Sequence, residues 1–166
     1  MKASAIIVAA GSGTRLGFDV PKAFVELGGR SLLSYSLRTI AAVAAIEEAV
    51  IALPAGMDAR ARDDIKAAGL EIPVKLTQGG AERQDSVRIA LELTGSDAEL
   101  VVVHDAARPF ATSSMFAGAL AAAERTGGAI VATPLADTLK RIIDDNDDGA
   151  SDRAGARTIV ATVARA

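Results

Sequence analysis

The stretch AIIVAAGSGTRLGFDVPKAF, Ala5 to Phe24, begins as an apolar strand, turns into a glycine-rich loop and ends in a proline and a lysine. Ile6 to Ala10 is apolar throughout, which is typical of a strand buried on both faces of a parallel sheet. In open α/β sheets, ligands bind beyond the carboxyl ends of the strands. This stretch therefore predicts an α/β fold with a site at its first turn.

The rest of the chain alternates short apolar runs with longer helical patterns. Helices of ten or more residues between the runs imply parallel pairing with right-handed crossovers, and hence a doubly wound α/β sheet. One helical face carries Leu33, Leu37, Ile40 and Ala44, with Ser31 as a cap. The further strand-like runs lie at 48–53, 73–78, 100–104 and 129–133, and the helical patterns at 31–45, 57–69, 83–93 and 113–125, with Gly69 and Gly127 ending two of them.

The pattern changes after Thr133. DTLKRII (137–143) and ARTIVATV (156–163) are two strand-like runs without a helix between them, joined by an acidic, glycine- and serine-rich stretch that we interpret as a mobile loop. Two strands joined directly predict an antiparallel hairpin that projects from the sheet. This hairpin is either a sheet edge or an arm that reaches a partner subunit.

Composition limits the possible functions. The chain has 166 residues, which fits one domain, and a net charge of −3, which gives no general attraction to nucleic acid or to an anionic membrane. It has no cysteine, so disulfides, thiolate metal sites and cysteine nucleophiles are excluded. The apolar run near Met1 breaks at glycine and is too short for a signal or membrane segment, so we expect a cytoplasmic protein.

Four loops are expected to converge at the carboxyl edge of the sheet. They follow the first, third, fourth and fifth predicted strands and read GSGTRLG, GGAERQDS, HDAARP and PLADT. The carboxyl ends of parallel strands meet at one edge, so the polar residues of these loops should surround one site.

The first loop contains Gly11, Gly13 and Gly17, which fit neither the dinucleotide fingerprint nor the P-loop pattern. Glycines can let backbone N–H groups approach a phosphate, but alone they indicate only a tight turn. Arg15 and Lys22 add two cations close to the loop, and the proline before Lys22 fixes the backbone there. These cations favour a phosphate site.

Asp105 ends an apolar run beside the expected site and is the candidate magnesium ligand, since a lone carboxylate commonly holds magnesium together with phosphate oxygens and waters. The alternatives are a helix cap or a partner for Arg108. His104, the only histidine, points to the opposite face from its neighbour and is interpreted as structural. In GGAERQDS, Ser86 and the glycine pair could contact a base or ribose, or the segment is an ordinary loop with Arg83 in solvent.

Four motifs, AAGSGTRLG...PKAF, GGAERQDSV, VVVHDAARPF and ATPLADTLKR, together resemble the 2-C-methyl-D-erythritol 4-phosphate cytidylyltransferases of the non-mevalonate isoprenoid pathway. The resemblance runs from Ala5 to about Arg165. It implies a Rossmann-like nucleotidyltransferase sheet in a single domain, 1–166, with a β-arm at about 134–165. It also implies a homodimer formed through that arm, and transfer of a cytidylyl group from CTP to methylerythritol phosphate with release of pyrophosphate.

The resemblance also assigns roles to residues. Arg15 and Lys22 match the catalytic pair that stabilises the transition state, and Asp105 matches the ligand of Mg²⁺. The other assigned residues are Ala9, Ala10, Gly11, Ser12, Gly13 and Thr14 around the triphosphate, Gly80, Ser86 and Ala106 around cytidine, and Arg108, Thr138 and Arg165 around the acceptor.

The sequence departs from the family pattern at Ala23, where glutamine is usual, at Ala81 and at Ala164. It also stops at Ala166, before the family's T-P-Q segment, so we expect a fragment of a longer chain, and weak or absent turnover even if CTP binds. Two other functions stay open: a cytidylyltransferase acting on a pentitol phosphate, and a catalytically silent nucleotide-binding module.

Overall fold

The computed structural model describes residues 1–11, 13, 20–134, 138, 140–144 and 157–162. The chain divides into two compact units, Met1–Val131 and Ala132–Ala166, which are described separately below. The predicted loop between the two hairpin strands falls mostly on 145–156, outside the described residues.

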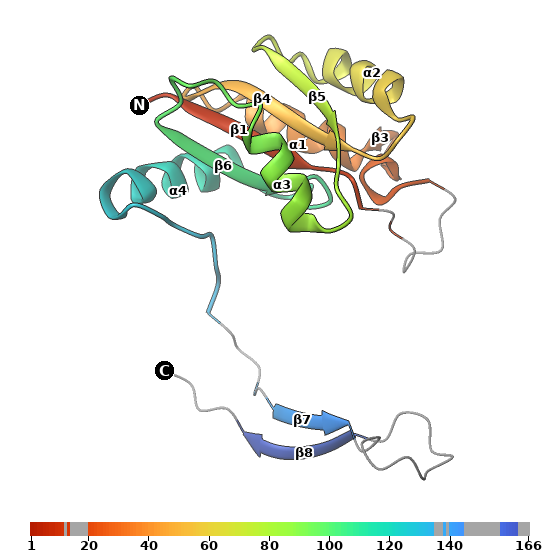
Figure 1. Cartoon of the computed structure of the whole chain (residues 1–166), viewed down its shortest axis with the longest axis vertical. Coiled ribbons are helices and arrows are strands. Elements are labelled where there is room, and N and C mark those ends of the chain that lie inside the picture. The colour runs from red at the N-terminus through yellow and green to blue at the C-terminus, as the bar shows by residue number, and fades with distance from the viewer. Residues whose placement is uncertain (12, 14–19, 135–137, 139, 145–156, 163–166) are drawn as a thin grey trace. The chain divides into compact units, whose positions relative to one another are not determined.

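The first unit is built on a parallel four-stranded sheet with the strand order β5-β4-β1-β6 (Figure 1). In the centre, Ile6 of β1 lies beside Val50 of β4 on one side and Val103 of β6 on the other. The predicted parallel α/β sheet is therefore confirmed. The strands span Ala3–Val8 (β1), Ile46–Leu53 (β4), Val74–Gln78 (β5) and Leu100–Asp105 (β6).

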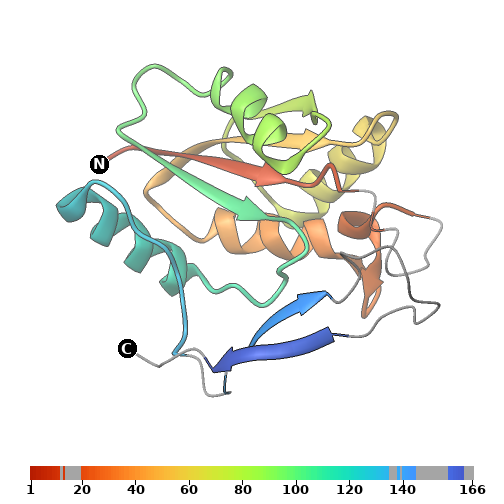
Figure 2. The same cartoon turned by 60° about the horizontal axis from the view of Figure 1, so that its bottom comes forward.

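Helices cover both faces of this sheet. Figure 2 shows α3 (light green) on one side and α1 (orange) on the other. The main buried cluster joins alternate residues of β1 to α1, α2 and α4, while Ile6 and Val50 point the other way and pack against Ala90 of α3. The doubly wound arrangement follows from this alternation. The helices span Leu32–Ala41 (α1), Asp58–Ala68 (α2), Arg83–Leu91 (α3) and Ser113–Thr126 (α4).

The predicted helix ends are largely confirmed. The Ser31 hydroxyl accepts a hydrogen bond from the Ser34 N–H at 2.9 Å and caps α1. Gly69 and Gly127 end α2 and α4 in the left-handed conformation, with φ of 67° and 81°. The expectation for Ala44 is wrong, because α1 ends at Ala41 and the buried side chain beyond it is Val43.

The predicted fifth strand, 129–133, is wrong. These residues form no strand, and the Ile130 side chain is 89% exposed. In the described part of the chain, β6 is paired only with β1, and no strand is hydrogen-bonded to 129–133. An apolar run becomes a strand only where a neighbour satisfies its backbone groups, and none of the described strands does so here.

A small hairpin and a short 3-10 turn were not predicted. Strands β2 (Glu26–Leu27) and β3 (Arg30–Ser31) pair antiparallel around Gly28 and Gly29, which have φ of 58° and 75°. Two successive glycines with positive φ form the tight turn that such hairpins prefer. The 3-10 turn η2, Lys22–Phe24, precedes this hairpin and carries the lysine singled out from the sequence.

The second unit contains the predicted antiparallel hairpin. Strand β7 (Lys140–Asp144) pairs with β8 (Arg157–Thr162), with Lys140 opposite Thr162. None of the helices among the described residues is long and apolar enough to cross a membrane.

Candidate functional site

Three of the four predicted loops leave the sheet at one edge. The Ala9 N–H donates to Ala52 O at 2.9 Å, the Gly79 N–H donates to Leu53 O at 2.9 Å, and the Ala106 N–H donates to Val8 O at 3.0 Å. Each bond continues the parallel ladder by one residue beyond β1, β5 or β6. The convergence of these loops is therefore confirmed. The fourth, PLADT, lies in the second unit, and its residues 135–137 fall outside the described part.

Gly79 is the contact point between two of these loops. A Cβ at Gly79 would collide with the Ala10 Cβ and would lie 2.8 Å from the Ser86 Oγ. A Cβ at Gly80 would likewise collide with Asp85. Only glycine lets the loop after β5 lie this close to the loop after β1, so the glycine pair has a packing reason independent of any ligand.

Ser86 stabilises the loop after β5 through hydrogen bonds of its side chain. Its hydroxyl accepts a hydrogen bond from the Gly80 N–H at 3.1 Å and donates to Glu82 O at 3.2 Å, and the side chain is buried. Glu82 and Asp85 form a capping box at the start of α3. The hydroxyl hydrogen of Ser86 is thus used within the loop, and its direct contribution here is to the shape of the loop.

Lys22 lies against the glycine loop. A Cβ at Gly13, which has φ of +67°, would lie 2.7 Å from the Lys22 Cβ, so these two residues are in direct contact. The Lys22 side chain is exposed and forms no ion pair with the residues that the structure describes. A charge held beside a glycine loop without a protein partner is suited to an anionic ligand. The other predicted members of this loop, Ser12, Thr14 and Arg15, lie outside the described residues.

Asp105 lies between two arginines. Its Oδ1 accepts a hydrogen bond from Arg83 Nε at 2.9 Å, and its Oδ2 accepts one from Arg108 Nε at 3.0 Å. The side chain of Asp105 is 29% exposed, against 60% for Arg83 and 74% for Arg108. Partial burial acts to raise the pKa of Asp105, but the two guanidinium groups outweigh it and bring the pKa below the ordinary value.

The pairing with Arg108 was one of the alternatives read from the sequence, and the structure shows it. The pairing with Arg83 was missed, since Arg83 was expected in solvent if the segment were an ordinary loop. The positions of the two residues in the predicted fold could have indicated the pairing. Arg83 opens the helix after β5, Asp105 ends β6, and both lie at the same edge of the sheet.

The chemistry of Asp105 suits a divalent metal ion. A carboxylate has about four lone-pair positions, of which the two arginines use two. In the described part of the chain, no group of three or more His, Cys, Asp or Glu side chains comes together. A metal at Asp105 would therefore take most of its ligands from water and from an anionic substrate, which is how magnesium is commonly bound.

His104 has a structural role, as predicted. It is buried, its Nε2 lies 3.0 Å from the Ser36 Oγ, and its ring meets Phe116 edge-on at 5.0 Å between centroids. Burial lowers the pKa of His104, because it disfavours the charged form of the ring. The neighbouring Ala106 is also buried, and its carbonyl oxygen accepts a hydrogen bond from the Ser36 hydroxyl at 3.1 Å. The side chain of Ala106 is therefore not exposed to a ligand.

The remaining positions singled out from the sequence are less informative. Ala23 is buried in the main apolar cluster, so the family's usual glutamine would need a different local packing there. Ala81 is exposed. Thr138 is exposed in the second unit, whereas Ala164 and Arg165 lie outside the described residues.

An open groove of about 630 Å³ is lined by Arg83, by Arg108 and by β6, along the edge of β6 that no strand in the described part of the chain pairs with. Asp105 lies at its polar end, and Val101, Val103 and Ile130 make its wall apolar. This groove was not predicted, because the sequence alone suggested a strand at 129–133.

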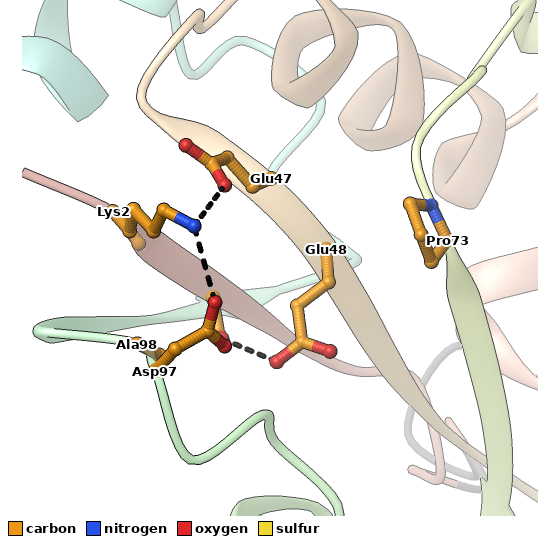
Figure 3. Close-up of a pocket in the computed structure, with 8 residues that line it drawn as sticks. Lys2, Glu47, Glu48, Pro73, Asp97 and Ala98 are labelled. Carbon is orange, nitrogen blue, oxygen red and sulfur yellow. Dashed lines mark hydrogen bonds and ion pairs between the residues drawn. The ribbon is translucent and has the colours of Figure 1, made fainter.

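A second hollow, of about 190 Å³, lies at the amino end of the parallel sheet, where β1 and β4 begin (Figure 3). Lys2 bridges Asp97 at 3.1 Å and Glu47 at 3.5 Å. Glu48 accepts from the Ser4 hydroxyl at 2.5 Å and from the Gly95 N–H. Three of the charges that line this hollow, Lys2, Glu47 and Asp97, are thus paired with one another, and the fourth, Glu48, is held by neutral donors within it and beside it.

The fold and the carboxyl edge together have the form of α/β proteins that bind phosphorylated ligands beyond a parallel sheet. The family model described as 2-C-methyl-D-erythritol 4-phosphate cytidylyltransferase matches residues 3–162. The chain belongs to this family.

Individual relatives agree with this assignment. The 2-C-methyl-D-erythritol 4-phosphate cytidylyltransferase of Deinococcus radiodurans is 49% identical over 140 residues, covering 84% of this chain and 54% of that protein. The enzyme of the same name from Cereibacter sphaeroides is 41% identical over 156 residues, covering 93% and 68%. The crystal structure of 4-diphosphocytidyl-2C-methyl-D-erythritol synthase from Anaerococcus prevotii superposes with a TM-score of 0.72 at 29% identity, over 97% of this chain and 68% of that one. The chain thus spans about half the length of the Deinococcus relative.

Proposed function

We propose that this protein transfers a cytidylyl group from CTP to 2-C-methyl-D-erythritol 4-phosphate and releases pyrophosphate. The observation that carries the proposal is the carboxyl edge of the sheet, where a glycine loop, the exposed Lys22 and the Asp105–arginine cluster lie on adjoining loops of a chain that belongs to this family. The family's name identifies both the group transferred and the acceptor.

The chemistry requires charge stabilisation rather than a general base. A phosphate monoester has a second pKa of about 6, so near neutral pH the acceptor is already mostly dianionic. One of its oxygens attacks the α-phosphorus of CTP, and the bond between that phosphorus and the bridging oxygen to the β-phosphorus breaks. The electron pair leaves with pyrophosphate. Cations must therefore bring two anions together and neutralise the developing charge.

We assign the cations and backbone donors of this chemistry to the following residues. Lys22 and Arg15 would neutralise the triphosphate, and Arg108 would bind the phosphate of the acceptor. We assign no part in the reaction to His104, which is buried and packs edge-on against Phe116. We further propose that the loop Ala9, Ala10, Gly11, Ser12, Gly13 and Thr14 surrounds the triphosphate, that Gly80, Ser86 and Ala106 lie around cytidine, and that Thr138 and Arg165 contribute to the acceptor site.

Magnesium is the metal we propose for this site. Asp105 would hold it together with phosphate oxygens and waters, and when bound it would supply further positive charge to the phosphates. The oxygen chemistry and the partial exposure of Asp105 support this assignment.

The test is calorimetric titration of the chain with CTP in the presence of magnesium, with ATP, GTP and UTP as controls, followed by a pyrophosphate-release assay. We expect binding of CTP in preference to the other three nucleotides, and a weak release of pyrophosphate that requires both CTP and methylerythritol phosphate. Equal release with a pentitol phosphate would contradict the proposed acceptor. Absence of any preference for CTP would contradict the proposed donor.

We also propose a single-domain organisation with the β7–β8 hairpin as an arm, and a homodimer formed through that arm. A two-stranded hairpin consists of two edge strands, and the backbone groups along an edge strand are suited to pairing with a second copy. Light scattering on the whole chain should give the mass of a dimer, and a monomer at micromolar concentration would contradict the arrangement. Cytoplasmic location and the absence of a nucleic-acid partner stay predictions from the sequence.

A further inference from the structure

We infer that Arg83 is a positioning residue that, together with Arg108, weakens the binding of a free divalent cation to Asp105, so that metal binds there more tightly together with the phosphates of the nucleotide than alone. The inference rests on the proposed function, because it takes Asp105 as the metal-binding carboxylate. It adds a role for Arg83 and a thermodynamic coupling between metal and nucleotide.

The geometry gives each oxygen of Asp105 its own cation. Arg83 Nε lies 2.9 Å from Oδ1, and Arg108 Nε lies 3.0 Å from Oδ2. Two guanidinium groups around one carboxylate leave this cluster with a net positive charge. A divalent cation that approaches without an anion meets electrostatic repulsion in addition to the competition for the carboxylate oxygens.

Both arginines are placed by local structure at this edge. Arg83 is the first residue of α3 and lies between Glu82 and Asp85, the two residues of the capping box. The Arg108 N–H donates to Asp105 O at 3.0 Å in a tight turn, which keeps this residue beside the carboxylate. The pairing with Asp105 therefore requires little ordering of the backbone, although the side chains themselves extend into solvent.

The exposure of the arginines makes the pairing exchangeable. Exposed ion pairs are weak, and Arg83 and Arg108 have most of their side-chain surface in water. Guanidinium groups bind phosphate at least as well as carboxylate, and with two parallel bonds. When the phosphates arrive, Arg83 can turn to the oxygens of the triphosphate and Arg108 to the phosphate of the acceptor, which releases lone pairs of Asp105 for the metal.

The consequence is positive coupling between the two ligands. The nucleotide removes the repulsion that weakens metal binding, so it raises the affinity of the site for metal, and the metal must raise the affinity for nucleotide by the same factor. Removing the charge of Arg83 should therefore make the site bind metal better when no nucleotide is present, and should weaken the coupling.

The experiment measures Mn²⁺ binding to the whole chain by electron paramagnetic resonance at low salt, without and with CTP. The variants are Arg83→Gln, which removes the charge, Arg83→Lys, which keeps it, and Arg88→Gln as the matched control. Arg88 lies on the same helix and also pairs with a carboxylate, Glu92, at 3.0 Å. Thermal melts show whether each variant is folded.

We expect Arg83→Gln to bind Mn²⁺ alone about threefold to tenfold more tightly than the unchanged chain, as removing one repelling charge near the surface should do. The factor by which CTP raises Mn²⁺ affinity should fall correspondingly. Arg83→Lys and Arg88→Gln should behave like the unchanged chain. Unchanged or weaker Mn²⁺ binding by folded Arg83→Gln would overturn the inference.

The result is separable from the proposed function. Mn²⁺ binding in the absence of nucleotide tests the inference without any turnover. If the unchanged chain shows no preference for CTP over other nucleotides, the proposed function fails, whatever the Mn²⁺ measurements give. If CTP binds but Mn²⁺ binding does not respond to Arg83→Gln, only the inference fails.

Discussion

The two ends of the parallel sheet each hold a carboxylate surrounded by donors, and they use it differently. At the amino end, Glu48 accepts from Ser4 and from the Gly95 N–H and lies 3.4 Å from Lys75 Nζ. At the carboxyl end, Asp105 accepts from Arg83 and Arg108. Burial acts to raise the pKa of each group, and the partners bring both pKa values below the ordinary range.

The difference lies in the partners. Glu48 is 16% exposed, and a backbone N–H and a buried serine, both fixed by the fold, are among its donors. The partners of Asp105 are two long cationic side chains that are mostly in water. A carboxylate held by fixed neutral donors stabilises the fold, whereas one held by exposed cations can exchange them for a ligand. The direction of a pKa shift alone does not separate the two cases.

The largest effect that this comparison predicts comes from replacing Lys22, the exposed lysine at the carboxyl edge of the sheet. Replacing Lys22 by alanine removes charge that would neutralise the transition state, and should lower the rate of pyrophosphate release by about a hundredfold or more. Because the side chain is exposed, the free energy of unfolding should change little.

Lys66→Ala is the matched control for this change. Lys66 is an exposed lysine at the end of α2, a helix that does not contribute to the carboxyl-edge loops. Its replacement should leave the rate unchanged. Turnover that survived the replacement of both Arg15 and Lys22 would contradict the proposed mechanism and the contrast between the two ends of the sheet.

The next effect concerns the loop contact at Gly79. Replacing Gly79 by alanine forces a Cβ against Ala10 and Ser86, which should lower the free energy of unfolding by about 1–3 kcal/mol, as overpacking does, and should weaken CTP binding in calorimetry. Gly118→Ala is the control, since Gly118 lies in α4 with no atom near the added Cβ. That change should stabilise the helix by about 0.5–1 kcal/mol. Equal effects of the two changes would contradict the close approach of the loops.

How much of this site the sequence could predict depends on the kind of signal. The parallel pairing, the convergence of three loops and the structural role of His104 follow from strand periodicity and from the rule for open sheets, which are local patterns. The strand expected at 129–133 failed because pairing depends on a neighbouring strand, which the run itself cannot specify. Arg83 was missed for the same reason, because its partner Asp105 lies 22 residues away in the sequence.

At the amino end, replacing Glu48 by glutamine should lower the free energy of unfolding by about 1–2 kcal/mol at neutral pH, because bonds to a charged acceptor become bonds to a neutral one. Urea denaturation measures the loss, and CTP binding should be unchanged. Glu47→Gln is the control. Glu47 is next in sequence but is 52% exposed and pairs only with Lys2 among the described residues, so its loss should cost less than about 0.5 kcal/mol.

The effect of Glu48 should depend on pH. Its pKa is lower in the folded protein than in the unfolded chain, so its charge contributes stability above the ordinary glutamate pKa. That contribution is lost as the pH falls through the folded-state pKa. The difference in unfolding free energy between the unchanged chain and Glu48→Gln should therefore shrink on acidification. A difference that stayed constant with pH would mean that the bonds to Glu48 do not depend on its charge.

The smallest effect comes from a third carboxylate, Asp64, whose pKa is shifted in the opposite direction to those of Glu48 and Asp105. Asp64 is buried in α2 and accepts from the Ser31 hydroxyl at 2.8 Å, but burial outweighs its partners and raises its pKa. A raised pKa in the folded state means that stability is lost as the pH rises from the ordinary aspartate value through the folded-state value. Asp64→Asn keeps an acceptor for Ser31 and avoids burying a charge. Urea denaturation should show a gain of less than about 1 kcal/mol at neutral pH that disappears at acidic pH, whereas a loss at neutral pH would place Asp64 with Glu48 as a stabilising charge.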